Sequence, residues 1–445
     1  MLPRELMENN EHFKLSSVTD SDPTQDSGHN LAWKTSPTYA AAFRCSGAGC
    51  EDPCCSEWDI PVDRSTYETY QTFSSPELRL LVSQFVFKCA QGAPESLFAR
   101  IYRGPSGSCP FLGTDHLCGI HKEYGPQLLS AACSIYPRAL NRIAGELEGA
   151  LSLSCPEAAK KVLLFPDFMQ IKGDLFSGDF RTDNSFSLDS SESESGLIRK
   201  PQRDCRAFRG VLIAMVRDRP RPMGQRLLLI GSLCKQMDAI IEELEGALLL
   251  EEYRRIFATG AKSSEPEDTP GQPRLKLEVV FDLTNARVQE GSGRRFQDNF
   301  WMFVETLGTS DACLPRDEVQ RFLEAKERYY RPFFEAFPFI LENYLVNYIF
   351  QHLFPYGRSG SRSFVSQSVF EEYVQMTTLF AWIDALLVGV AGHHKEAFAG
   401  EHVVQAVQSF TRTIEHYPGV LQSIKEYMKT RGLNTLQGMA IMLKS

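Results

Sequence analysis

The sequence lacks the features that mark several common classes of protein. It has no excess of positive charge, because 47 Lys and Arg residues stand against 56 Asp and Glu residues. The net charge of −9 excludes a general nucleic-acid binder that relies on neutralising phosphates. The N-terminal segment carries charges where a secretory signal requires an uninterrupted apolar run. We therefore expect a cytoplasmic protein with no nucleic-acid partner.

A run of apolar residues long enough to cross a membrane is also missing. The most apolar stretch, residues 377–392, is shorter than the ~20 residues that a spanning helix needs, and it contains Asp384. We expect this stretch to form a buried helix and the chain to have no membrane span.

Two fingerprints of binding sites are absent as well. No Gly-x-Gly-x-x-Gly follows a convincing strand, so the phosphate-binding turn of Rossmann-type folds is missing and the residues of a cofactor pocket stay unknown. No Cys-x2-Cys pair occurs, although structural zinc sites usually draw on such closely spaced pairs.

Cysteine itself is abundant and unevenly placed. Nine of the twelve cysteines lie between Cys45 and Cys155. In a reducing compartment, clustered cysteines bind metal or act in redox chemistry more often than they form disulfides. Two blocks stand out, and their eight members are the candidate metal ligands: Cys45, Cys50, Cys54, Cys55, Cys109, Cys118, Cys133 and Cys155.

The identity of the metal follows less directly from these blocks. Their long, irregular intervals favour an iron–sulfur cluster, most simply a 4Fe-4S cluster held by four cysteines, and zinc stays open as the alternative. The isolated Cys89, Cys205, Cys234 and Cys313 have no converging neighbours, and we expect them to pack as small hydrophobic residues.

Hydrophobic periodicity predicts a mainly α protein with few or no strands. Apolar residues recur at i, i+3, i+4 and i+7 through most of the sequence after residue 297. The segment 275–287 contains the β-rich core LEVVF and is a possible short strand, although a helix there stays open. We expect a loop-rich cysteine domain packed on a C-terminal helical bundle.

Composition divides the chain into five parts. They are a mobile leader at 1–36, a cysteine-rich metal domain at 37–166, a linker with a Ser/acidic loop at 167–200, a helical middle region at 201–296 and an α-helical bundle at 297–445.

The cysteine blocks resemble those of a known family. The runs FRCSGAGCEDPCCSEWDIPVDRSTYETY, CPFLGTDHLCGIHKEYGPQLLSAACSIYPR and LSLSCPEA are similar to the flagellin lysine-N-methylase family, and ENYLVNYIF and VQSFTRTIEH look like its C-terminal blocks. The resemblance spans roughly residues 39–416. At Glu57 the chain departs from the family, whose members tend to have Gly before the tryptophan.

The resemblance implies an enzyme that transfers methyl groups from S-adenosylmethionine to the ε-amine of lysines on flagellin, or on another lysine-bearing protein, and that carries an iron–sulfur cluster. The family's cysteine positions match all eight block cysteines. Two functions from other classes stay open: an iron–sulfur redox or sensor protein without methylase activity, and a zinc-stabilised interaction scaffold.

Methylation of lysine sets chemical requirements that name candidate residues. The amine has a reference pKa near 10.4, so desolvation or a nearby base must supply its neutral form. Aromatic rings attract a sulfonium or ammonium ion. Trp58, Tyr344, Asn343 and His416 are the catalytic candidates, and ordinary packing or helix capping is the alternative for each.

Overall fold

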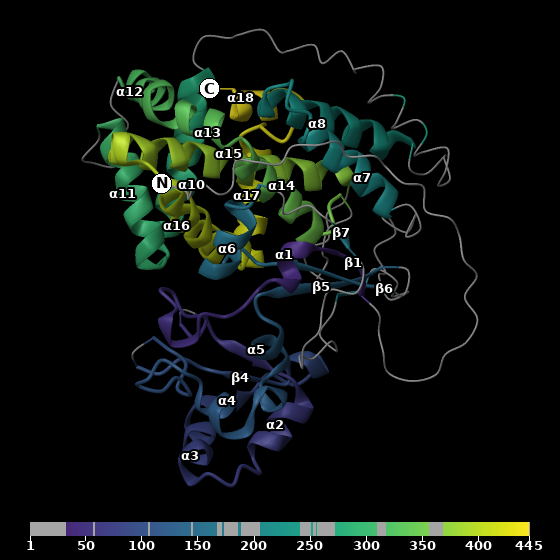
Figure 1. The fold of residues 1–445 in the computed structure, drawn as a ribbon, viewed down its shortest axis with the longest axis vertical. Coiled ribbons are helices and arrows are strands. Elements are labelled where there is room, and N and C mark those ends of the chain that lie inside the picture. The colour runs from purple at the N-terminus through teal and green to yellow at the C-terminus, as the bar shows by residue number, and fades with distance from the viewer. Residues whose placement is uncertain are drawn as a thin grey trace.

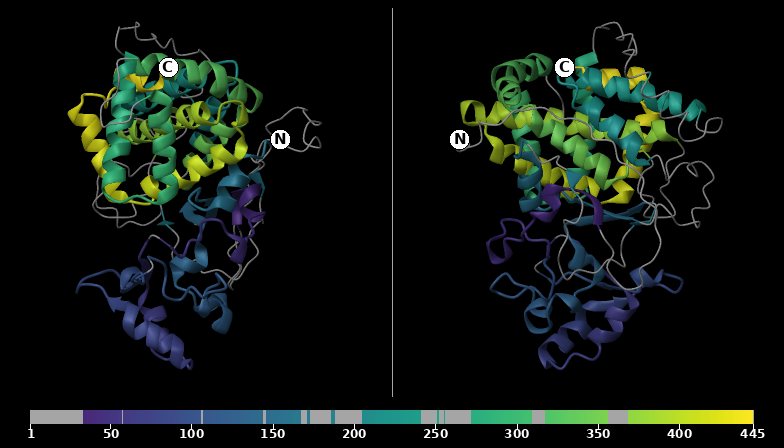
Figure 2. Two further views of the ribbon diagram at one scale, coloured as in Figure 1. Left: turned by 90° about the vertical axis from the view of Figure 1, so that its left-hand side faces the viewer. Right: turned by 45° about the vertical axis from the view of Figure 1, so that its right-hand side comes forward.

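A computed structural model places a large helical bundle above a small, loop-rich lobe (Figure 1). It describes residues 33–56, 58–105, 107–143, 146–166, 171–172, 186–187, 205–240, 251, 255, 272–308, 317–355 and 368–444. The views of Figure 2 show the lobe projecting from one end of the bundle. The expected mainly α fold with a loop-rich N-terminal part is confirmed.

The small lobe has a hydrophobic core of its own. Its three-stranded antiparallel sheet has the order β2-β4-β3, and the core contains Val62, Tyr70, Phe73 and Phe111. Side-chain caps start three of its helices: Asp63 accepts from the backbone N–H of Thr66 at α2, and a serine caps α3 and α5 in the same way. The elements are η2 (Gly47–Gly49), β2 (Ile60–Val62), α2 (Arg64–Tyr70), α3 (Pro76–Phe85), β3 (Val86–Lys88), η3 (Glu95–Leu97), β4 (Ala99–Ile101), α4 (Gly119–Tyr124), η4 (Pro126–Leu128) and α5 (Ala131–Ile135).

A second sheet lies between the lobe and the bundle and packs on the bundle's core (Figure 1). Its order is β7-β1-β6-β5-β8, with β5 and β6 forming an antiparallel hairpin. The elements of this layer are β1 (Trp33–Pro37), α1 (Thr38–Ala41), β5 (Arg138–Ile143), β6 (Glu146–Leu151), α6 (Pro156–Leu163), β7 (Ile171–Lys172) and β8 (Phe186–Ser187).

The helical bundle holds the main core of the protein. Its core side chains come from the second sheet, from the middle region and from the C-terminal helices alike. The elements are α7 (Cys205–Val216), α8 (Met223–Ile240), α10 (Gln272–Gln289), α11 (Arg294–Leu307), α12 (Glu318–Ala325), η5 (Lys326–Tyr330), α13 (Arg331–Ala336), α14 (Phe339–Gln351), α15 (Val369–His394), η6 (Lys395–Ala397), α16 (Gly400–Phe410), η7 (Thr411–Glu415), α17 (Pro418–Thr430) and α18 (Leu436–Leu443).

The central helix α15 contains the apolar stretch 377–392, and the expected buried helix is confirmed. By length and composition Val369–Ala397 is apolar enough to cross a membrane, but 89% of its most apolar window is buried inside the protein. Such burial is typical of the core helix of a packed bundle.

Three boundaries differ from the expectation. Part of the expected leader has regular structure, because Trp33–Pro37 form β1, whose partners β6 and β7 are distant in sequence. Residues 186–187, inside the expected Ser/acidic linker, pair with β5. The expected boundary at residue 296 falls within α11, so the middle region and the C-terminal bundle are one unit with a common core. The rest of the leader and linker lies outside the described residues.

The possible strand at 275–287 is a helix. Residues 272–289 form α10, in which Leu277, Val279, Val280 and Phe281 are buried. The β-branched run suggested a strand, but neighbouring helices surround the segment, and burial on several sides requires no alternation of polar and apolar residues.

Candidate functional site

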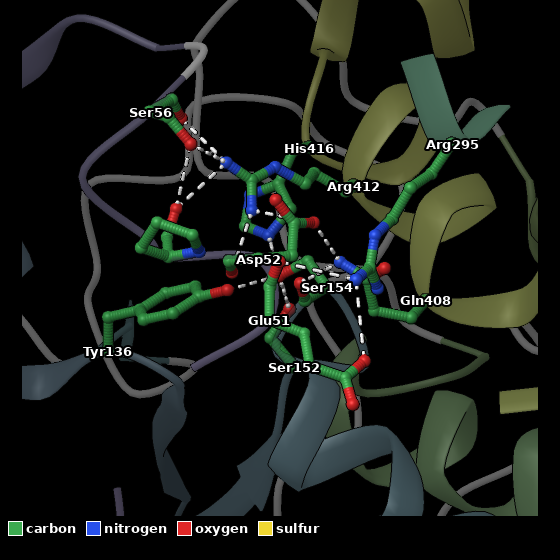
Figure 3. Close-up of polar contacts among 11 residues, drawn as sticks. Glu51, Asp52, Ser56, Tyr136, Ser152, Ser154, Arg295, Gln408, Arg412 and His416 are labelled. Atoms are coloured by element: carbon green, nitrogen blue, oxygen red, sulfur yellow. Dashed lines mark hydrogen bonds and ion pairs between the residues drawn. The ribbon is translucent and has the colours of Figure 1, made fainter. Parts of the chain in front are cut away.

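The small lobe and the bundle meet at the first cysteine block. Figure 3 shows Gln408, Arg412 and His416 reaching from the bundle towards this loop. Arg412 belongs to η7, a π-helix of five residues that directly follows α16. Short π-helical turns occur often at functional sites, because the wider turn redirects the side chains that it carries.

Arg412 is the central contact of this junction, and its side chain is only 3% exposed. Its Nη1 donates to Asp52 O at 3.2 Å and lies 2.9 Å from Asp52 Oδ2. Its Nη2 donates to Pro53 O at 3.1 Å and to Ser56 O at 2.7 Å. The guanidinium also lies over the Trp58 ring, 4.8 Å from the ring centroid. One cation therefore binds the backbone on both sides of the paired cysteines.

Two further bundle side chains hold the same loop. Gln408 is fully buried, and its Nε2 donates to Asp52 Oδ2 at 2.7 Å and to Ser154 O at 2.8 Å. Arg295 donates to Glu51 O at 3.2 Å, but Glu51 is 77% exposed. The contact of Gln408 is thus part of the packed junction, and that of Arg295 lies at its rim.

His416 lies at the end of η7 in a chain of hydrogen bonds (Figure 3). Its Nε2 lies 2.5 Å from Ser154 Oγ and 3.2 Å from Ser152 Oγ. Ser154 Oγ is also 3.0 Å from Tyr136 OH, and the Trp58 ring lies 5.2 Å from the imidazole, centroid to centroid. An imidazole in such a chain can accept or release a proton near neutral pH.

Tyr344 belongs to a neighbouring, buried group. Its hydroxyl donates to Glu415 Oε1 at 2.9 Å, and His352 Nε2 lies 3.5 Å from Glu415 Oε2. Burial raises the pKa of Tyr344 well above its usual value, and the Glu415 charge adds to the rise. Because the tyrosine is 1% exposed and stays protonated, it is a hydrogen-bond donor to this carboxylate.

Asn343 makes structural contacts with the end of α6. Its Nδ2 donates to Val162 O at 2.9 Å and to Phe165 O at 2.8 Å. These carbonyls lie at the end of α6, where a helix leaves its last carbonyls without internal partners. Asn343 therefore caps α6 from the side.

Five block cysteines form one electrostatic group within the small lobe. A hydrogen bond from Cys55 and the nearby Arg412 lower the pKa of Cys54 to about 7, against the effect of burial. Burial raises the pKa of Cys109 to about 12, and it also raises that of Cys133. Both values rise further through charge on Cys54 and Cys118, so these thiols lie near one another.

The other three block cysteines adjoin this group. Burial raises the pKa of Cys155, which precedes the first turn of α6, to about 12, and the charges of Cys50 and Cys54 contribute. Burial also raises the pKa of Cys50, and Cys45 contributes to that rise. Cys54 therefore interacts electrostatically with thiols of both blocks.

The donor set fits a thiolate-bound metal centre in its chemistry. The thiols are gathered, six of the eight are partly or fully buried, and backbone N–H groups oppose the pKa rise of Cys109, Cys118 and Cys155. Hydrogen bonds to sulfur are among the means by which proteins tune iron–sulfur centres. Across the described residues, however, no group of three or more His, Cys, Asp or Glu side chains is arranged to hold a metal ion.

The isolated cysteines differ in their surroundings. Cys234 is fully buried in the bundle core, as expected, whereas Cys89 is only half-buried. The side chain of Cys205 and all of Cys313 lie outside the described residues, as does Glu57.

Sequence reasoning selected Trp58 and His416 but did not link them to Gln408, Asp52 or Ser154. The available signal was spacing, because the polar residues at 408, 412 and 416 recur every four positions and so lie close to one face of a helix. A hollow of about 560 Å³ is lined by residues of α11, α12, η5 and α15, and none of the junction residues belongs to its lining.

Comparison with known proteins gives a consistent set of matches. The sequence model of the FliB lysine N-methylase C-terminal domain matches residues 209–442. The chain is 34% identical over 139 residues to the Lysine-N-methylase of Salmonella typhimurium strain LT2, which covers 31% of this chain and 34% of that protein. It is equally similar to the flagellar biosynthetic protein FliU of Salmonella muenchen, of which it covers 80%. The chain thus spans about a third of the length of the lysine-N-methylase that it matches. No solved structure matches this chain.

Proposed function

This chain belongs to the FliB lysine N-methylase family, and we propose that it transfers methyl groups from S-adenosylmethionine to the ε-amine of lysines on flagellin. The family match carries the proposal, because it covers residues 209–442 and so includes Arg412 and His416 of the junction. The names of the relatives support both a lysine methylase and a flagellar substrate. The reaction would take place in the cytoplasm, before flagellin is exported.

The proposed metal centre belongs to the cysteine blocks. We propose that thiolates among the eight block cysteines hold an iron–sulfur cluster, with zinc as the alternative. Their shared electrostatic environment around Cys54 supports this assignment. When bound, such a cluster supplies redox-active iron to the junction.

His416 is the proposed proton acceptor for the substrate lysine. The residue is exposed, so a side chain from a protein substrate has access to it, whereas Tyr344 is 1% exposed. Ser154 and Ser152 orient the imidazole through its Nε2. Proton transfer by a positioned side chain contributes about 10²–10⁴-fold to rate.

Trp58 is proposed to position the junction instead of binding the methyl donor. The guanidinium of Arg412 already lies over its ring. A second cation at the same ring face, such as the sulfonium of the donor, would meet the repulsion of the first.

The proposal is tested with full-length protein, S-adenosylmethionine and flagellin from the same organism. We expect mass spectra of flagellin to show lysines modified in multiples of one methyl mass, and calorimetry to show binding of the donor. His416→Ala should lower the rate about 10²–10⁴-fold without loss of metal. Tyr344→Phe, which removes a buried hydrogen bond, should reduce stability and retain methyl transfer.

One result would overturn the proposal. If the fully metallated wild-type protein binds no donor and leaves the lysines unmodified, a redox or sensor function replaces methyl transfer. Visible absorption that bleaches with reductant would support that function, whereas a zinc scaffold would be colourless.

A further inference from the structure

We propose that Arg412 is a positioning residue that fixes the shape of the loop carrying Cys54 and Cys55, so that the helical bundle sets the geometry of the thiols. The inference concerns the loop itself. It holds whether the thiols bind iron or zinc, and it does not depend on methyl transfer.

The loop makes few hydrogen bonds of its own: Ser56 Oγ donates to Pro53 O at 2.9 Å, and Cys55 O accepts from the N–H of Cys109 outside the loop. Residues 50–56 contain no helix or strand, and an isolated bridge between Ser56 and Ser108 is their one β-type pairing among the described residues. The loop residues are exposed or partly buried, so a fixed backbone shape depends on such contacts with the rest of the protein. Arg412 supplies donors to the carbonyls of Asp52, Pro53 and Ser56, at 2.7–3.2 Å.

The contacts use the forked shape of the guanidinium. Nη1 binds the carbonyl and the carboxylate of Asp52. Nη2 donates to Pro53 O and to the carbonyl and hydroxyl oxygens of Ser56. Arginine presents several donors in one rigid plane, whereas lysine presents a single nitrogen that cannot reach both ends. The geometry therefore requires the fork as well as the positive charge.

The guanidinium is itself held in place. Gln408 binds the same Asp52 carboxylate, the Trp58 ring covers the guanidinium, and the Arg412 side chain is 3% exposed. The partners are about 360 residues apart in the chain, so the contact joins two separately packed cores. Residues that orient metal ligands in this indirect way commonly contribute about 10–100-fold to metal affinity.

Two variants and one control test the inference in the full-length protein, prepared without oxygen. Arg412→Met keeps an unbranched stem and removes the charge, whereas Arg412→Lys keeps the charge and removes the fork. Arg295→Met is the matched control, because Arg295 contacts the same loop at the exposed Glu51.

The first measurement is iron, zinc and sulfide per chain during challenge with a chelator. The second is the rate at which iodoacetamide alkylates Cys55, measured by peptide mass spectrometry and compared with the rate at Cys234. Because Cys234 is fully buried in the bundle core, its alkylation reports unfolding of the bundle.

We expect both Arg412 variants to hold metal about 10–100-fold more weakly than the wild type. Cys55 should be alkylated faster in both, Cys234 should stay protected, and Arg295→Met should match the wild type. The inference would be overturned if both Arg412 variants retained metal as well as the wild type and if their Cys55 were alkylated no faster than in the wild type. Wild-type metal affinity and Cys55 reactivity in Arg412→Lys would also overturn the inference, because the positive charge alone would then be enough to hold the loop.

Two further outcomes are decisive. If Cys234 becomes as reactive as Cys55 in both variants, Arg412 supports the whole fold and the inference fails. If the wild-type protein carries no metal, the alkylation rates decide alone. Failure of the wild type to methylate flagellin leaves this test unchanged, so the two proposals fail separately.

Discussion

Replacing Asn343 with alanine separates a structural role from a catalytic one. The side chain is 1% exposed, and its amide donates to Val162 O and Phe165 O at 2.9 and 2.8 Å. Alanine would leave both carbonyls without this donor and a space where the amide was. Because the carbonyls lie at the end of α6, the loss would loosen the contact of that helix with α14.

The cost follows from the two hydrogen bonds. A neutral hydrogen bond contributes about 1 kcal/mol net, and a buried group left without a partner costs about 1–3 kcal/mol. Partial access of water to the helix end reduces the sum, so we expect a loss of about 2–4 kcal/mol in the free energy of unfolding. In a large domain each kcal/mol lowers Tm by about 2–4 °C, which gives a decrease of about 4–16 °C.

The assay combines thermal unfolding, followed by circular dichroism, with methyl transfer measured well below Tm. The control is Gln422→Ala in α17. It removes an exposed amide that donates a hydrogen bond to Glu426 of that helix. It should change stability by no more than about 0.5 kcal/mol. An Asn343→Ala protein with an unchanged Tm and greatly reduced methyl transfer would refute the structural role and favour contact with the reacting groups.

Four other substitutions test the remaining assignments. Cys54→Ser should abolish metal binding, whereas Cys234→Ser should keep the metal and lose about 1–3 kcal/mol of stability by burying a hydroxyl, as elemental analysis and thermal unfolding would show. Burial lowers the pKa of Lys326 to about 8, so Lys326→Met should stabilise the protein by about 3 kcal/mol at pH 7. The stability advantage of Lys326→Met should shrink as pH rises from 8 towards 10.5, because in that window the unfolded wild-type chain keeps the lysine proton and the folded chain has lost it. A difference in unfolding free energy between variant and wild type that stays constant with pH in denaturant titrations would contradict this. In Gly389→Ala the new methyl would lie 2.5 Å from Phe303 Cα and force α11 and α15 apart, lowering Tm by an amount equivalent to about 1–3 kcal/mol.

The helices of the bundle were predictable because their pattern is local. Apolar residues at helical spacing predicted α14, α15 and α17, and Ser368 caps the start of α15 by accepting from the backbone N–H of Glu371. The segment 272–289 was less clear, because its β-branched run is compatible with either a strand or a helix. The strand at 33–37 was not predicted, since its order comes from pairing with β6, more than 100 residues away.

The candidate site was predictable on one side only. Cysteine type and spacing are visible in the sequence, and they selected the loop around Cys54 without any knowledge of the fold. The partners of that loop were not visible, because Arg412 and Gln408 approach it through contacts that only the tertiary fold creates. A polar residue in an apolar helix shows that a partner exists, but its spacing does not identify the partner.

The division of the site between the two cores bears on how the family match is interpreted. The matched region, residues 209–442, contains Gln408, Arg412 and His416 but none of the eight block cysteines. The thiols, with the loop that carries Cys54, belong to the part of the chain that precedes it. Neither part has both the thiols and the groups that hold their loop, and Arg412 joins the carbonyls of that loop to the bundle. Arg412 and the proposed proton acceptor His416 lie within one short stretch of backbone, so a shift of η7 would move both the support of the thiol loop and the imidazole.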